Sequence, residues 1–374
     1  MSLYNQYWKF VAKIISIATV VPPYKHNQDG ICRFMNLAYS DIGDNERRVL
    51  KFLYNKSGIE SRYSVIKDYS VEMEEWEFYP KTVGMEPFPN VEQRMEWFDR
   101  HACGLALDAS LKCIAGIAAV GDITHLITIS CTGISAPGLE LALMHALQLP
   151  VSVSRSTVNF MGCYAAVHGL KQANDIVLAH PEAKVLMVCT ELCTLHFQKT
   201  YTPEAILSPI LFADGCAAVL VSADSDPNPG IQLNSFYAEV IKDSKNDMTW
   251  NISSTGFVMT LSGEVPDIFK SDIVPLKKRA LQKAGLTDDD IKYWSIHPGG
   301  KRILECLAAG LGLTDEDVKY SYQILRNYGN MSSPTILFVL NEIWKEHQAE
   351  KGAHIFGAAF GPGLTMESMI LTIV

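Results

Sequence analysis

Asn159-Phe160-Met161-Gly162-Cys163-Tyr164-Ala165-Ala166-Val167-His168-Gly169-Leu170 is a polar turn that runs into an apolar segment, with a cysteine at the junction. From Ala166 to Val177 apolar residues recur at helical spacing, so Cys163 is expected at or near a helix N-terminus. Unpaired N–H groups and the positive end of the helix dipole favour the thiolate, the form that a nucleophilic cysteine needs. The alternative is a small buried residue that only packs, because free cysteine is among the most buried residue types.

The composition is that of an ordinary globular protein. The 374 residues are 48% hydrophobic and 20% charged, which allows two or more core units and argues against disorder. The formal net charge is −9, from 41 acidic and 32 basic residues without a Lys/Arg block. This balance argues against nucleic acid or an anionic membrane as a partner.

The N-terminal region and the cysteines indicate the compartment. The one short apolar run, Ile14 to Val21, is too short to span a bilayer and has no small-residue cleavage site. Nine cysteines, an odd number, without a secretion signal predict free thiols and a cytoplasmic location. The close pair Cys189 and Cys193 has no second Cys/His pair at zinc-finger spacing, so no metal site is expected.

Strand-like and helix-like segments alternate along the chain. The pattern predicts a strand within residues 9–20, a helix within 41–61, a long loop with short helices over 76–99, a helix over 102–120, a buried strand over 123–129, a helix from Pro137 and a strand over 185–189. This alternation predicts an α/β fold with a largely buried sheet.

The second part of the chain repeats this order at one offset. Adding 168 carries the strand at 123–129 onto 291–297, the cysteine turn onto 327–330 and the strand at 185–189 onto 353–357. Identities are few, but three elements share the offset. We therefore expect two duplicated α/β halves, residues 1–222 and 223–374, with their turns facing one cavity.

Under this overlay His297, like Cys131, is expected at the end of a strand, and Asn330, like Cys163, is expected at a turn that starts a helix. A histidine beside a cysteine can hold the thiolate as an ion pair, so we expect a Cys163 pKa well below the usual value of about 8.5. The histidine Nε2–H and the asparagine amide would form an oxyanion hole for enolate charge on a thioester oxygen. Taken singly, His297 would be a turn histidine and Asn330 a turn or cap residue. Together with Cys163 they favour catalysis.

At these residues the sequence resembles the type III polyketide synthases, the chalcone and stilbene synthase family, over nearly the whole chain. The matching stretches are residues 158–166, 211–219, 297–300, 328–333 and 360–365. The resemblance implies a thiolase-like fold of two duplicated halves in a layered αβαβα arrangement, a homodimer, and no metal or redox cofactor. The run Glu191-Leu192-Cys193 is more similar to bacterial members.

The resemblance also implies the reaction. Cys163 would take a starter acyl group from acyl-CoA and hold the growing chain. His297 and Asn330 would bind the thioester oxygen of malonyl-CoA, promote decarboxylation and stabilise the enolate that attacks the acyl-cysteine. Repeated condensation would build a poly-β-keto chain that cyclises to a product such as a pyrone or resorcinol. Phe212 matches the gatekeeper phenylalanine between the CoA tunnel and the cavity.

The departures from the family concern the cavity. Met259 replaces the second gatekeeper phenylalanine and is a softer wall, and Trp250 falls where plant members have glycine, which would narrow the elongation cavity. Further cavity residues are expected at Cys131, Cys193, His196 and Ser332. The first three stand where plant chalcone synthases carry threonines, so a flavonoid product is not expected.

The basic residues expected to bind the CoA phosphates also differ. Lys56 matches a family basic residue, whereas the two preceding basic positions fall on Phe52 and Val49, with Arg48 adjacent to Val49. Arg302, after the His-Pro-Gly-Gly turn, offers a further cation. The expected CoA contacts are therefore Lys56, Arg48 and Arg302.

Two other classes remain open at this point. A ketoacyl-acyl-carrier-protein synthase III has the same fold and the same three catalytic residue types, but its histidine typically lies in a His-Gln-Ala-Asn run. The runs His297-Pro298-Gly299-Gly300 and Phe360–Thr365 favour the polyketide synthase. A non-catalytic acyl-binding or scaffold protein would keep the fold, but retention of all three catalytic residue types argues against it.

Overall fold

The structure is a computed structural model that describes residues 11–202 and 205–374. Its main sheet has the strand order β11-β12-β13-β8-β1-β7-β6-β4-β5. These strands are β1 (Ala12–Val20), β4 (His125–Ser130), β5 (Ser154–Asn159), β6 (Val185–Leu192), β7 (Asp214–Ala223), β8 (Ile231–Val240), β11 (Ile291–Ile296), β12 (His354–Gly361) and β13 (Thr365–Ile373). Strands β1 and β8 pair through Lys13–Gln232 and Ile14–Ile231, so two half-sheets meet at a narrow seam.

The two half-sheets have the same internal order, which confirms the predicted duplication. In the first, β4 and β6 are parallel, β7 is antiparallel to β6, and β1 is antiparallel to β7. In the second, β11 and β12 are parallel, β13 is antiparallel to β12, and β8 is antiparallel to β13. The strands β11 and β12 begin 166 and 169 residues after β4 and β6. The division at residues 222 and 223 stays a prediction.

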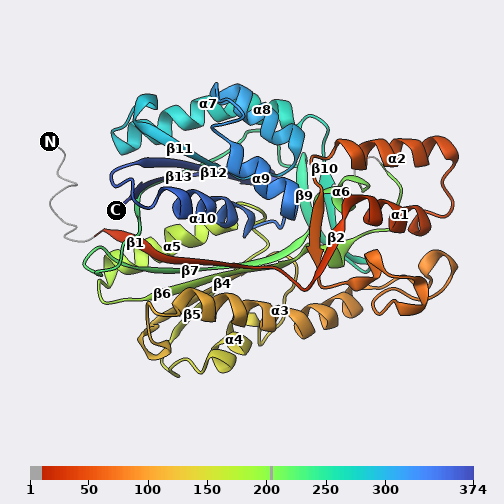
Figure 1. The fold of residues 1–374 in the computed structure, drawn as a ribbon, viewed down its shortest axis with the longest axis horizontal. Coiled ribbons are helices and arrows are strands. Elements are labelled where there is room, and N and C mark those ends of the chain that lie inside the picture. Colours follow the sequence, from red (N-terminus) through yellow and green to blue (C-terminus); the bar gives the residue numbers. More distant parts are fainter. Residues whose placement is uncertain (1–10, 203–204) are drawn as a thin grey trace.

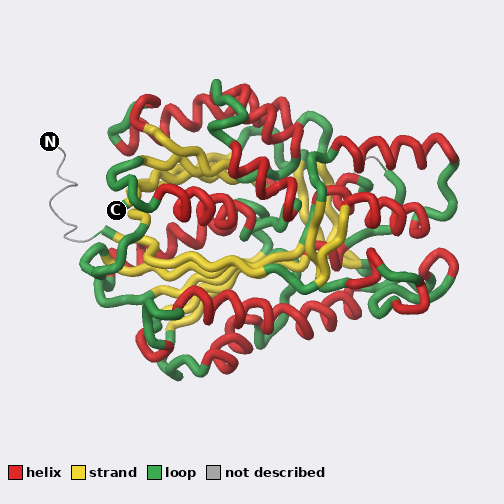
Figure 2. Tube along the Cα trace, viewed as in Figure 1, coloured by secondary structure: helices red, strands yellow, loops and turns green. Residues whose placement is uncertain are grey.

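Helices and half-sheets alternate in five layers (Figure 1). The helices are α1 (Gln28–Ala38), α2 (Asp44–Lys56), α3 (Val91–Ile114), α4 (Leu139–Leu147), α5 (Ala165–Ala179), α6 (Leu207–Leu211), α7 (Val265–Ala284), α8 (Lys301–Leu311), α9 (Lys319–Tyr328) and α10 (Thr335–His347). Helices α7 and α8 cover one half-sheet, α3 and α4 cover the other, and α5 and α10 lie between them. Figure 2 shows the strands between these helical layers. The thiolase-like αβαβα arrangement is therefore confirmed.

The central layer explains why the fold is one unit. Buried side chains of α5, among them Val167 and Leu170, share a core with Leu337 and Leu340 of α10 and with strands of both half-sheets. Burial of this apolar surface is the main favourable term in folding. The helix that begins after the cysteine turn is thus packed from both halves.

Most predicted elements occur where the pattern placed them, with one clear error. The predicted strand within residues 9–20 is β1, although residues 9 and 10 lie outside the described ranges. The predicted loop over 76–99 is wrong from Val91 onward, because α3 begins there. The Asn90 side chain accepts from the Gln93 N–H at 3.0 Å while Gln93 Oε1 accepts from the Asn90 N–H at 3.0 Å, a capping box that starts the helix.

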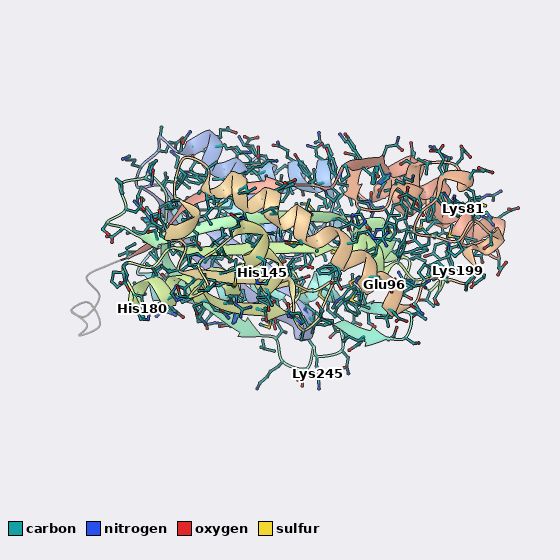
Figure 3. The ribbon with its side chains drawn as sticks, turned by 90° about the horizontal axis from the view of Figure 1, so that it is seen from below. Lys81, Glu96, His145, His180, Lys199 and Lys245 are labelled. Atoms are coloured by element: carbon teal, nitrogen blue, oxygen red, sulfur yellow. The ribbon has the colours of Figure 1, made fainter. Side chains whose placement is uncertain are left out.

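Small elements gather at the end of the molecule away from the chain termini (Figure 1). They include two hairpins, β2 (Tyr24–Asn27) with β3 (Ser61–Ser64), and β9 (Met248–Ser253) with β10 (Gly256–Leu261). The loop before α3 is anchored there. Figure 3 labels Lys199 at this end, and its Nζ donates to Gly84 O at 2.6 Å. Within residues 11–202 and 205–374, no helix is long and apolar enough to cross a membrane.

Candidate active site

A cavity with an empty volume of about 740 Å³ lies where the turns of both halves meet. The three predicted catalytic residues line it, together with six predicted cavity residues: Phe212, Met259, Trp250, Cys131, Cys193 and Ser332. Cys163 therefore reaches the same space as His297 and Asn330, which follow it by 134 and 167 positions, because the carboxyl ends of β4 and β11 both open into it.

Cys163 lies on the turn between β5 and α5. Gly162 has a φ of 86°, which favours glycine, and a Cβ there would overlap the ring of Pro362. The Gly162 N–H donates to Cys131 Sγ at 3.0 Å. Cys131 therefore helps to hold the turn that presents Cys163, a role that its cavity position alone does not reveal.

Asn330 is held by both its backbone and its amide. Its N–H donates to Leu211 O at 2.9 Å, and its carbonyl accepts from the Ala213 N–H at 2.9 Å. Its Nδ2 donates to Gly299 O at 3.0 Å, and its Oδ1 accepts from the Ser332 N–H at 2.8 Å. The Oδ1 lies 4.0 Å from Cys163 Sγ, so the amide stands directly beside the thiol.

His297 follows β11 and is only 2% exposed. Its backbone N–H donates to Ala358 O at 2.9 Å, which continues the strand pairing. Among the described residues, neither ring nitrogen has a hydrogen-bond partner. Buried polar atoms in native proteins are almost always paired, so an imidazole of this kind on a cavity wall indicates a ligand.

Burial controls the titration of both groups. It raises the pKa of the Cys163 thiol to about 12 and lowers the pKa of the His297 imidazole to about 3. The prediction of a low Cys163 pKa is therefore wrong for the chain without substrate. The cavity removes water from the thiol, and α5 begins only at Ala165, so the helix end does not outweigh this desolvation.

Glu191 is a functional candidate that the sequence analysis did not identify. It is the penultimate residue of the fully buried strand β6 and is itself 0% exposed. Its Oε2 accepts from the Cys131 N–H at 2.9 Å and from Thr132 Oγ1 at 3.0 Å, and its Oε1 accepts from Ser333 Oγ at 2.7 Å. Burial raises its pKa to about 7. A single acid near the end of a strand that is apolar apart from Thr190 was the available signal.

Phe212 lies between two cavities. A second cavity, of about 350 Å³, shares Phe212 and Cys193 with the larger one and is also lined by His26 and Arg62. Phe212 directly follows α6, and its backbone forms a parallel bridge with Asn330. The predicted gatekeeper phenylalanine and the predicted catalytic asparagine therefore lie on directly paired backbone.

The β9–β10 hairpin forms the opposite wall. Trp250 and Met259 are paired across it, and Trp250 Nε1 donates to Cys131 O at 2.7 Å. His196, predicted as a cavity residue, is not part of the wall. Its ring stacks on Phe257 at 4.2 Å and hydrogen-bonds Thr132 O at 2.8 Å, so it supports the wall from behind.

The predicted CoA residues lie outside this cavity. Arg48 and Lys56 are exposed on α2, and Arg302 lies on α8, where its Nη2 is 3.8 Å from Asp267. The side chain of Lys301 covers Gly58, with its Cδ 3.1 Å from where a Cβ would lie. The start of α8 therefore packs beside the end of α2, which brings Lys56 and Arg302 onto neighbouring elements.

Family models identify the class. The description "chalcone and stilbene synthases, N-terminal domain" matches residues 4–225, and the C-terminal domain of the same family matches residues 232–374. The chain belongs to the chalcone and stilbene synthase family, the type III polyketide synthases, which are acyltransferase-type condensing enzymes.

Individual relatives place the chain within this family. It is 32% identical over 370 residues to the "alpha-pyrone synthesis polyketide synthase-like Pks18" of Mycobacterium tuberculosis, covering 97% of this chain and 92% of the relative. It is 32% identical to "type III polyketide synthase A" of Arabidopsis thaliana, covering 86% and 82%. The crystal structure of PKS-I from the brown alga Ectocarpus siliculosus superimposes with a TM-score of 0.92 at 29% identity, covering 99% of this chain and all of that one.

Proposed function

We propose that the chain loads an acyl-CoA starter on Cys163, extends it with malonyl-CoA by decarboxylative Claisen condensation, and releases a cyclised product. One observation carries the proposal: a thiol, an amide and a buried imidazole with unpartnered ring nitrogens line the same cavity. This is a nucleophile beside two donors for a carbonyl oxygen.

In the loading step Cys163 Sγ attacks the thioester carbonyl of acyl-CoA. A new S–acyl bond forms and the bond to the CoA sulfur breaks. The thiol proton ends on the departing CoA thiolate, and the His297 ring, whose nitrogens have no partner among the described residues, would relay it between the two sulfurs as the S–acyl bond forms. The acyl group then sits on Cys163 beside the amide of Asn330.

In the extension step malonyl-CoA loses carbon dioxide, and the electron pair of the broken C–C bond becomes an enolate. Its oxygen would accept from His297 Nε2–H and from the Nδ2 hydrogen of Asn330 that Gly299 does not use. The enolate carbon attacks the acyl carbonyl on Cys163 and expels the thiolate. The chain, two carbons longer and now on CoA, returns to Cys163 for another round.

The substrates and assembly follow from the same proposal. The CoA phosphates would bind Lys56 and Arg302, on the adjacent ends of α2 and α8, and Arg48, two turns earlier in α2. The chain would act as a homodimer, and residues 1–222 and 223–374 would be its two duplicated units. A pyrone is favoured over a resorcinol because one of the relatives is named for alpha-pyrone synthesis. Phe212, Met259 and Trp250 would set the length of the chain that fits.

Mass spectrometry of products and of intact protein tests the proposal. With acyl-CoA starters and malonyl-CoA, we expect an acyl mass on Cys163 that is absent in Cys163→Ala, and cyclic products of more than one extension. A single linear condensation product would instead indicate the synthase III class. Wild-type protein that never acquires the acyl mass would indicate a scaffold.

A further inference from the structure

Arg62 of β3 is a buried guanidinium bound by neutral oxygens. It is 3% exposed, its Nε donates to Gln28 Oε1 at 3.1 Å, its Nη2 donates to Pro209 O at 2.7 Å, and its Nη1 donates to Phe212 O. In the described part of the chain, it forms no ion pair with a carboxylate. The buried carboxylate of Asp214 acts on the guanidinium electrostatically but without a direct ion pair. Burying a charge whose direct partners are all neutral is costly, so this guanidinium calls for a role beyond packing.

The carbonyls that Arg62 binds belong to one short segment, Pro209–Phe212. Within it, Ile210 O accepts from Gln28 Nε2 at 3.0 Å, and Leu211 O accepts from the Asn330 N–H at 2.9 Å. Pro209 O also accepts from Tyr54 Oη at 3.1 Å. All four carbonyls are therefore held by groups from outside the segment.

Arg62 also contacts the backbone that leads into Asn330. Gly329 has a φ of 71°, and a Cβ there would lie 2.8 Å from Arg62 Cδ. The next residue is Asn330, whose carbonyl accepts from the Ala213 N–H at 2.9 Å. One side chain thus binds the carbonyl of Phe212 on one side and packs against the Asn330 turn on the other.

We propose that Arg62 is a positioning residue that holds Phe212 and Asn330 in register and thereby supports the extension step more than the loading step. The inference rests on the proposed function. A planar guanidinium can bind two carbonyls and an amide oxygen at once, whereas a lysine ammonium is a point charge that cannot reproduce this fork. Arg62→Lys would keep the charge and lose the geometry.

The matched control is Arg94→Lys. Arg94 is a second fully buried guanidinium, with Nε donating to Pro89 O at 3.1 Å and Nη1 to Leu195 O, and among the described residues it donates no hydrogen bond to the Pro209–Phe212 segment. Single-turnover acylation of Cys163 and the rate of malonyl-CoA extension are measured in both variants. We expect Arg62→Lys to keep acylation within about twofold and to lose about 10- to 100-fold in extension, because small misplacements of a catalytic group have effects of this size. Arg94→Lys should keep the ratio of the two rates.

Hydrogen exchange gives a readout that does not depend on activity. The amides of Ala213 and Asn330 should exchange at least tenfold faster in Arg62→Lys than in wild type, but not in Arg94→Lys. Equal losses in acylation and extension, or unchanged exchange at both amides, would overturn the proposal. If wild type fails to acylate Cys163, the proposed function fails, while the exchange result still decides the positioning role.

A second variant covers the case in which Arg62→Lys does not fold. Gln28→Met leaves the guanidinium in place but removes its bond to Nε and the bond to Ile210 O. We expect a smaller change in the same direction, with faster exchange at Ala213 and Asn330 and a lower ratio of extension to acylation. A wild-type ratio together with wild-type exchange would contradict the inference.

Discussion

His297 is the catalytic candidate whose side chain lacks hydrogen-bond partners within the part of the chain that the structure describes. Its imidazole is buried, neutral and without a ring-nitrogen partner among the described residues, whereas the neighbouring Asn330 amide has protein partners at both ends. Desolvation strengthens any hydrogen bond that a substrate oxygen then makes to it. The site is therefore suited to stabilise negative charge that develops inside the cavity.

Asn330→Ala tests the second donor. We expect the extension rate to fall about 10²- to 10³-fold, the effect typical of removing one oxyanion-hole donor, while acylation of Cys163 changes little. Asn327→Ala, in the last turn of α9 and outside the cavity lining, is the control and should retain extension. Rates are measured by mass spectrometry of quenched reactions, and an extension rate within threefold of wild type would contradict the role.

Glu191→Gln tests the buried carboxyl by its pH dependence. Burial raises the pKa of Glu191 from 4.5 to about 7, so the folded chain holds the proton to higher pH than the unfolded chain. Stability is then lost as pH rises from 4.5 through about 7, by at most about 3 kcal/mol. The glutamine cannot titrate. Urea unfolding is therefore measured for wild type and Glu191→Gln at pH 5 and at pH 8. Between these two pH values the free energy of unfolding should fall more in wild type than in the variant. An equal change in both proteins would refute this.

At the scale of elements, the β9–β10 hairpin is a separate two-stranded sheet, and its cavity-facing side chains are fixed by neighbouring segments. Trp250 is fixed by its bond to Cys131 O and by an edge contact with His196 at 5.6 Å. His196 in turn is held by the Phe257 N–H, which donates to its Nδ1 at 3.1 Å. Cavity size thus depends on side chains from three separate segments.

Trp250→Gly is expected to lengthen the product. Removing the indole opens the cavity beside Met259 and deletes the bond to Cys131 O. Trp250→Phe, which loses the bond but keeps most of the wall, should leave product length unchanged. Product masses from one starter decide the matter, and equal lengths in wild type and Trp250→Gly would discard this account of chain length.

At the scale of the whole molecule, the central helical layer joins the halves. The core around α5 and α10 contains Ile127 and Val185 from one half-sheet and Ile355 and Leu371 from the other. Neither half could bury this surface alone. The catalytic residues consequently sit at an interface whose geometry depends on both halves.

We therefore expect the two halves to unfold in one cooperative transition. In calorimetry at fixed protein concentration, the measured enthalpy should equal the van't Hoff enthalpy of the cooperative unit. Phe338→Ala, in the buried face of α10, should lower the midpoint without splitting the transition, at a cost of about 3–5 kcal/mol. Two resolved transitions would contradict a shared core.

The amino-acid sequence was sufficient for the alternating elements, the duplicated order and the gathering of Cys163, His297 and Asn330 at strand and helix ends. These features depend on local periodicity and on turn residues, which act over a few positions. The start of α3 could have been predicted too, because Asn90 and Gln93 have capping-box spacing.

The tertiary structure alone decided what surrounds those residues. The raised pKa of Cys163, the unpartnered imidazole of His297, the place of His196 behind the wall, the bond between Glu191 and Ser333 across the halves, and the bond from Arg62 to Phe212 all come from segments far apart in the chain. Burial and hydrogen bonding depend on which distant atoms exclude water from a group. Periodicity along the chain carries no record of those neighbours, so the chemistry of the site emerges only when the two halves close on one cavity.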